Sequence, residues 1–146
     1  MKRRFAFFLV FAPLAGCTAN DELAVSRAPP MVVIAEHDVK VREAPPHGAI
    51  GMSTAYRISD AAPQPHKMEF RRRVLDVGAA IGEHPISHDE VYYVTSGRGV
   101  VVSDGVAETI GAGTAAYLYE GAVVGIRQIG DEPLSIIIAY PVDQKN

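Results

Sequence analysis

An all-β fold is the class that this sequence predicts, and two observations support it. From about residue 68 onward, short runs rich in Val, Ile and Tyr alternate with turns that contain glycine. These strand-like runs recur about every 8–12 residues, a spacing typical of an antiparallel sandwich or barrel. Helical periodicity of apolar residues is scarce along the same stretch. We therefore expect one antiparallel all-β domain.

The N-terminal part of the domain is expected to add short strands to this core. Residues 31–43 begin with β-branched side chains and then alternate between apolar and charged, which is the pattern of a strand with one buried face. The proline- and glycine-containing stretch 44–51 ends this segment. A second short strand is expected at residues 54–58.

Two turns and one basic cluster complete the prediction of elements. Residues 96–99, Ser-Gly-Arg-Gly, separate two β-rich runs and predict a hairpin. Residues 130–133, Gly-Asp-Glu-Pro, form a good turn between the last two strands. Residues 71–73, Arg-Arg-Arg, are interpreted as a solvated strand face.

The first residues predict export. A basic start at residues 2–4 precedes an apolar run at residues 5–14, which is shorter than the roughly 18–20 residues of a membrane-spanning helix. The following Leu-Ala-Gly-Cys resembles a bacterial lipoprotein signal. That resemblance implies cleavage before Cys17 and lipidation of its thiol and new amino terminus. Thr18 after the cysteine implies outer-membrane sorting, with the domain in the periplasm.

Cleavage at this point changes the charge of the chain. Removing 16 residues and their three cations leaves 130 residues with 11 basic and 17 acidic side chains, a net charge of −6. An acidic exported protein is not expected to bind nucleic acid. Cys17 is the only cysteine, so no intrachain disulfide can form, and lipidation gives this lone cysteine a role.

The stretch that begins at Gly78 resembles the first sequence motif of the cupins, a family of small jelly-roll barrels. In that motif a glycine precedes two histidines, a glutamate and a second glycine at fixed spacing. His84, Glu90 and Gly97 stand at the matching positions, and Ile86 stands where the second histidine is expected.

The second motif of the same family is matched incompletely, one hairpin later along the chain. Gly113 and Gly121 are in place. Tyr119 replaces the usual proline, Val124 the metal-binding histidine and Gln128 the usual asparagine. Of the family's metal set of three histidines and a glutamate, only one histidine and the glutamate therefore survive at their usual positions.

The resemblance covers roughly residues 68–142 and implies a small antiparallel jelly-roll barrel with N-terminal extra strands. The expected organisation is a lipoprotein signal peptide at 1–16, a flexible tether at 17–30, N-terminal strands and loops at 31–66, and a cupin domain at 67–142.

Whether this barrel holds a metal depends on where three side chains point. In an extended strand, His88 and Glu90 would share one face, whereas His84 would lie about 20 Å from Glu90, too far to share an ion. A bend near Pro85 would bring His84, His88 and Glu90 together as candidate ligands for Zn, Fe, Mn or Ni. The leading expectation is that no metal is bound tightly, because two of the family's ligand positions are apolar.

The function that we expect is the binding of a small molecule inside the barrel, beside a degenerate metal site. The candidate ligand-binding residues are His84, Glu90, Tyr92 and Gln128, and no catalytic residue is assigned. The alternative is a metal-dependent cupin enzyme, an oxygenase, isomerase or decarboxylase, that uses His84, His88 and Glu90. A third alternative is a structural role in which the outer sheet forms a homodimer. The expected partners are thus a small molecule, a membrane reached through the lipid anchor and, in the third case, a second copy of the chain.

Overall fold

The computed structural model describes residues 29–48 and 50–142. The chain divides into two units, Met1–Met31 and Val32–Asn146, and all elements named below lie in the second. The expected signal peptide, Cys17 and most of the expected tether lie outside the described residues. Within the described residues, no helix has the length and apolar character needed to cross a membrane.

Strands make up nearly all the regular structure of the described residues. In chain order the elements are η1 (Glu36–Val39), β1 (Lys40–Glu43), β2 (Ser53–Tyr56), η2 (Ser59–Ala61), β3 (Met68–Leu75), β4 (Ala80–Pro85), β5 (Glu90–Ser96), β6 (Arg98–Ser103), β7 (Val106–Gly111), β8 (Ala115–Leu118), β9 (Val123–Ile129) and β10 (Leu134–Pro141); η1 and η2 are short 3₁₀ helices.

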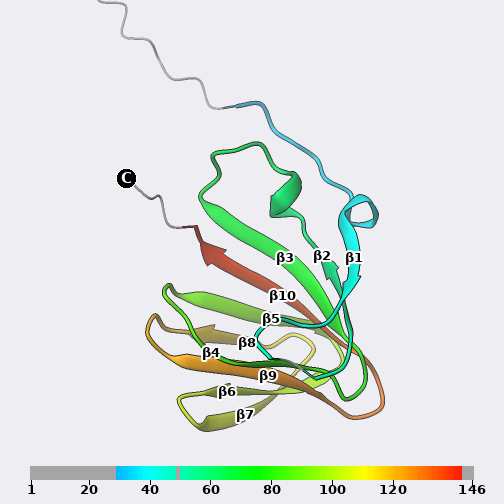
Figure 1. The fold of residues 1–146 in the computed structure, drawn as a ribbon, viewed down its shortest axis with the longest axis vertical. Coiled ribbons are helices and arrows are strands. Elements are labelled where there is room, and N and C mark those ends of the chain that lie inside the picture. Colours follow the sequence, from blue (N-terminus) through cyan, green and yellow to red (C-terminus); the bar gives the residue numbers. More distant parts are fainter. Residues whose placement is uncertain (1–28, 49, 143–146) are drawn as a thin grey trace, which may run out of the picture. The chain divides into compact units, whose positions relative to one another are not determined.

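The strands form two antiparallel sheets (Figure 1). The larger sheet has the order β1-β2-β3-β10-β5-β8, and the smaller has the order β4-β9-β6-β7. Neighbours in these orders are mostly distant in sequence, as in a jelly roll, so the chain passes repeatedly from one sheet to the other. The predicted fold class, an antiparallel all-β barrel with extra N-terminal strands, is confirmed.

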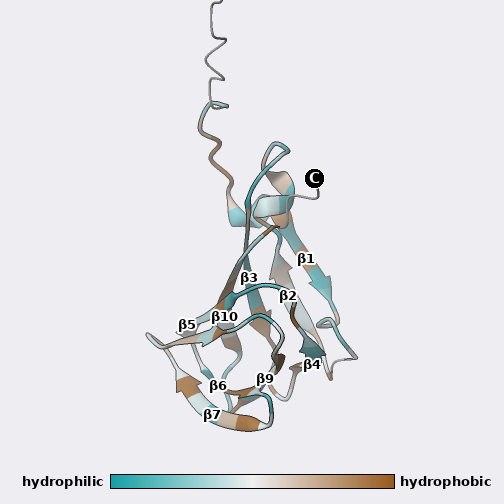
Figure 2. Ribbon diagram, turned by 90° about the vertical axis from the view of Figure 1, so that its left-hand side faces the viewer, coloured by the Kyte–Doolittle hydropathy of each residue, from teal (hydrophilic) through white to brown (hydrophobic). Residues whose placement is uncertain are grey.

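The core lies between the inner faces of the two sheets. Alternate residues of each strand point inward, as the period of two requires. Along β5 the buried residues are Glu90, Tyr92 and Val94, the set that strand alternation predicts. Figure 2 shows hydrophilic colour along β1 and hydrophobic colour on parts of β7 and β9. The main buried hydrophobic residues are Leu75, Ile81, Ile86, Tyr92, Val94, Val101, Ile110, Val124, Ile126, Leu134, Ile136 and Ile138.

The hairpin predicted at residues 96–99 is wrong, although the strands on either side are present. β5 pairs with β10 and β8, whereas β6 pairs with β9 and β7 in the other sheet. Gly97 lies where the chain crosses between the sheets, with a φ of 77°. A Cβ atom at Gly97 would lie 2.2 Å from the carbonyl oxygen of Pro133, in the link between β9 and β10. Glycine is needed here because two sheet-crossing links touch, and not because a hairpin turns.

The N-terminal strands are shorter than the sequence predicts. Only the last four residues of the expected strand at 31–43 form a strand, and a 3₁₀ turn precedes them. β1 pairs with β2 from Lys40–Tyr56 to Glu43–Ser53, and β2 in turn pairs with β3. The two N-terminal strands therefore extend the larger sheet.

Candidate functional site

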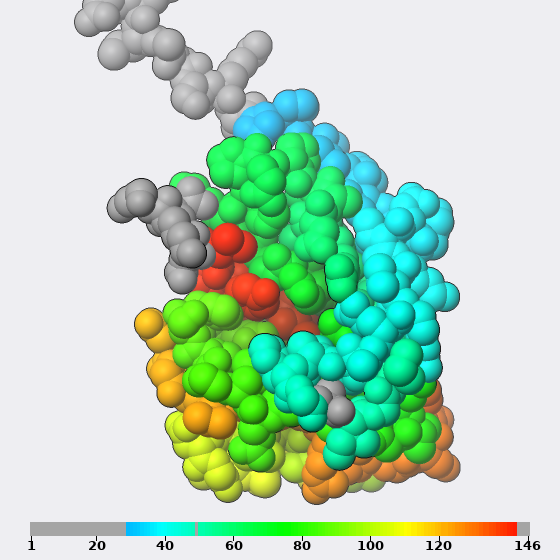
Figure 3. All heavy atoms as spheres, viewed as in Figure 1, coloured from blue at the N-terminus to red at the C-terminus, as the bar shows by residue number. Residues whose placement is uncertain are grey.

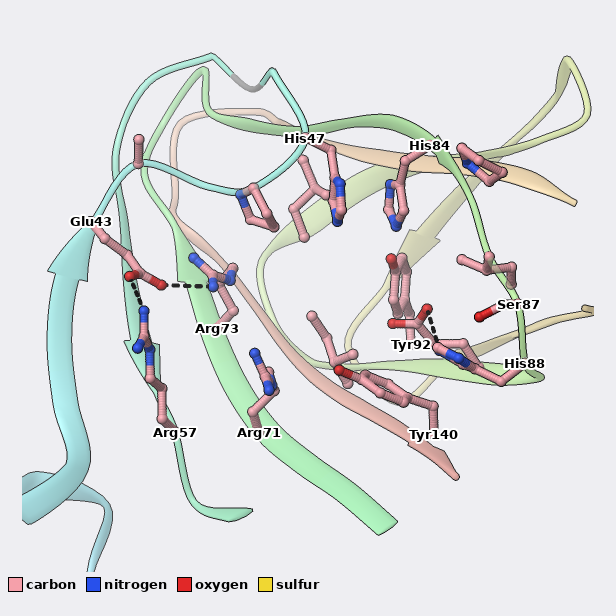
Figure 4. Close-up of a pocket in the computed structure, with 17 residues that line it drawn as sticks. Glu43, His47, Arg57, Arg71, Arg73, His84, Ser87, His88, Tyr92 and Tyr140 are labelled. Carbon is pink, nitrogen blue, oxygen red and sulfur yellow. Dashed lines mark hydrogen bonds and ion pairs between the residues drawn. The ribbon is translucent and has the colours of Figure 1, made fainter. Parts of the chain in front are cut away.

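A cavity of about 460 Å³ opens between the two sheets. Both sheets contribute to it, together with the segment after β1 and the loop between β4 and β5 (Figure 4). Its lining residues are Glu43, Ala44, Pro46, His47, Arg57, Arg71, Arg73, Ile81, His84, Pro85, Ile86, Ser87, His88, Glu90, Tyr92, Ile138 and Tyr140.

A β-bulge in β4 aims His84 at this cavity. Ile81 pairs with Ile126 and His84 pairs with Val124, so β4 has one residue more than β9 over this interval. The bulge places both Ile81 and His84 on the inner face. Nδ1 of His84 lies 2.9 Å from the carbonyl oxygen of Gly82. Because a carbonyl only accepts, Nδ1 carries the hydrogen, and in the neutral ring Nε2 is left as an acceptor.

The segment after β1 lies across β4 and brings a second histidine against His84. A Cβ atom at Gly82 would lie 1.8 Å from the carbonyl oxygen of His47, so this close approach requires glycine. The His47 and His84 rings stack at 3.5 Å between centroids, with planes 9° apart. In Figure 3 the cyan atoms of this segment lie over the green strands. Burial lowers the pKa of His47, and the nearby His84 and Arg73 lower it further.

A buried carboxyl occupies the opposite wall. Glu90 begins β5 and is 5% exposed. Burial raises its pKa to about 7, although the Arg71 guanidinium acts in the opposite direction. Nε2 of His88 lies 3.8 Å from Oε2 of Glu90, too far for a hydrogen bond. The His88 ring stacks on Tyr140, with centroids 4.2 Å apart, so His88 points into the cavity.

Tyr92 forms the floor of the cavity beside this carboxyl. Its side chain is 1% exposed and follows Glu90 on the inner face of β5. Burial raises the pKa of Tyr92, and the Glu90 carboxylate raises it further. Burial also raises the pKa of Tyr140. Both phenols therefore stay protonated and can donate hydrogen bonds at neutral pH.

Arginines line the end of the cavity nearest to β1. Glu43 accepts hydrogen bonds from Nη2 of Arg57 and, at 2.9 Å, from Nη2 of Arg73. Nη1 of Arg73 donates to Oγ of Ser53 at 2.7 Å, and the Arg73 side chain is 4% exposed. Burial alone would raise the pKa of Glu43, but the hydrogen bonds from Arg73 and Arg57 lower it below its usual value. The carboxylate of Glu43 is therefore ionised between two guanidinium groups.

The interpretation of residues 71–73 as a solvated strand face is wrong. Arg71 and Arg73 line the cavity because they share the inner face of β3 with buried Leu75. Nε and Nη2 of Arg71 contact Oε1 of Glu69 at 2.9 and 2.6 Å. Arg72 points to the other face, where it pairs with Glu36 and covers the Tyr56 ring at 3.8 Å. Because side chains alternate between the two faces of a strand, the sequence of β3 could have shown that Arg71 and Arg73 point to one face and Arg72 to the other.

Gln128, which the sequence predicts as a ligand-binding residue, does not line this cavity. Its side-chain oxygen accepts a hydrogen bond from the backbone of Gly78 at 2.7 Å. Its amide nitrogen donates to the carbonyl oxygens of Gly130 and Glu132. Gln128 is buried, as strand alternation predicts, but it satisfies the backbone of two connecting segments.

The predicted metal ligands come together only incompletely. His84, His88 and Glu90 all line the cavity. However, the described residues contain no group of three or more His, Cys, Asp or Glu side chains placed to hold one metal ion. Val124, which pairs directly with His84, offers no donor from β9. These donors do not fit the four-ligand metal centre that the motif resemblance implies.

The site thus contains four of the predicted site residues, together with charged and histidine side chains that sequence reasoning missed. His84, His88, Glu90 and Tyr92 share the cavity. The missed side chains are Glu43, His47, Arg57, Arg71 and Arg73.

This geometry defines a jelly-roll barrel with a polar cavity between its sheets. Comparison with known protein families identifies the family to which this barrel is similar. Residues 71–140 match the family described as the cupin domain. This region of the chain is a cupin domain. No curated protein matches the sequence.

Solved structures support the same fold. A Thermotoga maritima protein described as a predicted oxalate decarboxylase is 23% identical, with a TM-score of 0.69 over 77% of this chain and 100% of that one. The polyketide cyclase RemF of Streptomyces resistomycificus is 18% identical, with a TM-score of 0.64 over 80% of this chain and 83% of that one. An RmlC-like cupin from Shewanella frigidimarina is 17% identical, with a TM-score of 0.58 over 79% and 95%. At these identities the likeness extends to the fold alone.

Proposed function

We propose that this protein binds a small molecule in the cavity of its cupin barrel. The observation that carries the proposal is the convergence of His84, His88, Glu90 and Tyr92 on one cavity of about 460 Å³. Small-molecule sites are typically about 300–1,000 Å³, with a few polar groups set among apolar walls. Here Ile81, Ile86 and Ile138 supply the apolar walls.

Native mass spectrometry after incubation with a small-molecule extract tests this proposal. Ser87 is an exposed residue at the cavity, and Ser87→Trp should fill the space with an indole ring. Thr109→Trp, on the exposed face of β7, is the matched control. We expect the parent and the Thr109 variant to retain a bound mass that the Ser87 variant loses. Retention of the same mass by all three proteins would contradict binding in this cavity.

The proposed address is the periplasmic face of the outer membrane, with a lipid anchor on Cys17. It is supported by the signal-like sequence before that cysteine. Cys17→Ser should release the protein from the membrane fraction or leave the leader uncleaved. Normal cleavage together with unchanged membrane partitioning of this variant would refute the anchor. The homodimer stays a prediction, which sedimentation velocity tests.

A metal-dependent enzyme is the second candidate, and one observation favours it. His88 points into the cavity, and its Nε2 lies 3.8 Å from Oε2 of Glu90, so two of the three alternative ligands are neighbours. Elemental analysis of protein purified without a histidine tag tests this candidate. One equivalent of a transition metal in the parent, lost in His88→Ala, would favour the enzyme over simple binding.

A further inference from the structure

The cavity wall nearest to β1 concentrates three guanidinium groups, those of Arg57, Arg71 and Arg73. Each has a carboxylate partner: Glu43 pairs with Arg57 and Arg73, and Glu69 pairs with Arg71. Asp60 lies farther away, 4.0 Å from Arg57 and 3.9 Å from Arg71 between the nearest oxygen and nitrogen atoms. What these guanidinium groups can still offer a bound molecule depends on the N–H groups that their partners leave unused.

The arginines nearest to β1 are incompletely satisfied. Glu43 serves both Arg57 and Arg73, so one carboxylate is shared between two cations. Among the described residues, the buried polar side-chain atoms without a hydrogen-bond partner are Nε of Arg57 and Nε of Arg73. Buried charge that lacks full compensation is costly. An anion in the adjacent cavity would stabilise this pair through its field, even without touching the buried Nε atoms.

Arg71 is the cation that a bound anion can reach. In Figure 4 it lies between Arg73 and Tyr140. Its Nε and Nη2 are engaged by Glu69, while no hydrogen bond among the described residues uses Nη1. The side chain is 23% exposed, against 4% for Arg73. A guanidinium edge presented in this way suits a carboxylate oxygen.

The rest of the cavity favours a flat apolar body behind that charge. The stacked pairs His47–His84 and His88–Tyr140 form two planar surfaces. Isoleucine side chains from β4, β10 and the loop after β4 fill the space beside them. Parallel ring faces suit a planar group, and the aliphatic side chains give it an apolar contact surface.

We infer that the cavity binds a small organic acid, with its carboxylate against Arg71 and a planar apolar body between the histidine and tyrosine rings. This inference rests on the proposed function and names the chemical class of the molecule bound. Neutral analogues of the same shape should bind much more weakly because they lack the carboxylate charge that strengthens a hydrogen bond from Nη1 of Arg71.

The test is calorimetric titration of the full chain at pH 7 with benzoate, phenylacetate and cinnamate, and with the amide of each acid. We expect at least one acid to bind saturably and its amide to bind at least tenfold more weakly. Arg71→Gln should weaken binding of that acid at least tenfold. Arg72→Gln, the neighbour that points to the opposite face, should change it less than twofold.

A second variant guards against loss of folding. Glu69 is buried, so Arg71→Gln alone leaves it without its partner, whereas the double variant with Glu69→Gln removes both charges. Weak acid binding by a folded double variant supports the inference. An amide that binds as tightly as its acid overturns the inference and leaves the proposed function standing. If neither acids nor amides bind, the inference is also overturned, and the extract experiment decides separately on the proposed function.

Discussion

Replacing Glu90 by glutamine should stabilise the protein at neutral and alkaline pH. The pKa of Glu90 rises from 4.5 to about 7 on folding because the carboxyl is buried. The folded protein therefore holds this proton more tightly than the unfolded chain between pH 4.5 and about pH 7. The favourable contribution is fully present below pH 4.5 and is lost as the pH rises through about 7.

The size of the effect follows from the shift in pKa. At about 1.4 kcal/mol per unit, the difference between 4.5 and about 7 corresponds to about 3 kcal/mol of unfolding free energy lost above pH 7. Glutamine has the shape of the protonated acid and does not ionise. Glu90→Gln should thus match the parent near pH 4 and exceed its stability by about 3 kcal/mol near pH 8.

Urea unfolding followed by far-ultraviolet circular dichroism measures this difference, since the chain has no tryptophan. Curves at intervals from pH 4 to pH 8 give the unfolding free energy of the parent and of Glu90→Gln. Glu108→Gln, on the exposed face of β7, controls for loss of a surface charge. A Glu90→Gln variant that is equally or less stable than the parent at pH 8 would show that Glu90 is ionised and well paired, which refutes the reasoning.

Three further predictions test the geometry of the barrel. Gly97→Ala should destabilise the protein about 1–3 kcal/mol more than Gly113→Ala in urea unfolding. Both glycines have positive φ, but only the methyl group added at Gly97 would meet backbone atoms. Equal losses of stability would contradict the contact between the β5–β6 link and the β9–β10 link. Gly82→Ala should displace the segment that crosses β4, seen as faster amide hydrogen exchange in residues 44–48 with the rest of the barrel unchanged; unaltered exchange there would argue against the close approach. Ile86→His with Val124→His should create a tight Zn²⁺ site that calorimetry detects and the parent lacks; no gain in affinity would count against the alignment of the second motif.

The local pattern of the sequence predicts the strands well because alternation and turn residues act over a few neighbours. β5 and β10 lie where β-rich runs are bounded by glycine and proline. The local pattern does not show which strands pair. A glycine such as Gly97 allows a change of direction whether the chain returns to the same sheet or crosses to the other. The hairpin prediction was wrong because this choice depends on contacts with residues far along the chain.

The candidate site divides in the same way. His84 and Glu90 were found because a motif of fixed spacing contains them. Arg73 was missed although it lies two residues before buried Leu75 and therefore on the same face of β3. A run of three arginines indicates an exposed strand face more strongly than the strand period indicates an inward position. His47 had no signal, since its place depends on a backbone φ of 65° and on the absence of a side chain at Gly82, far along the chain.

The pairing of β2 with β3 has a consequence for the smallest fragment that can fold. The region matched by the cupin family begins at residue 71, but Arg73 within it is bound by Ser53 and Glu43, which precede that region. A fragment trimmed to residues 67–142 would keep this buried guanidinium and lose both partners. We expect such a fragment to misfold or aggregate and not to retain a reduced version of the cavity. The segment that the family match covers is thus shorter than the segment that supplies the partners of its buried charge.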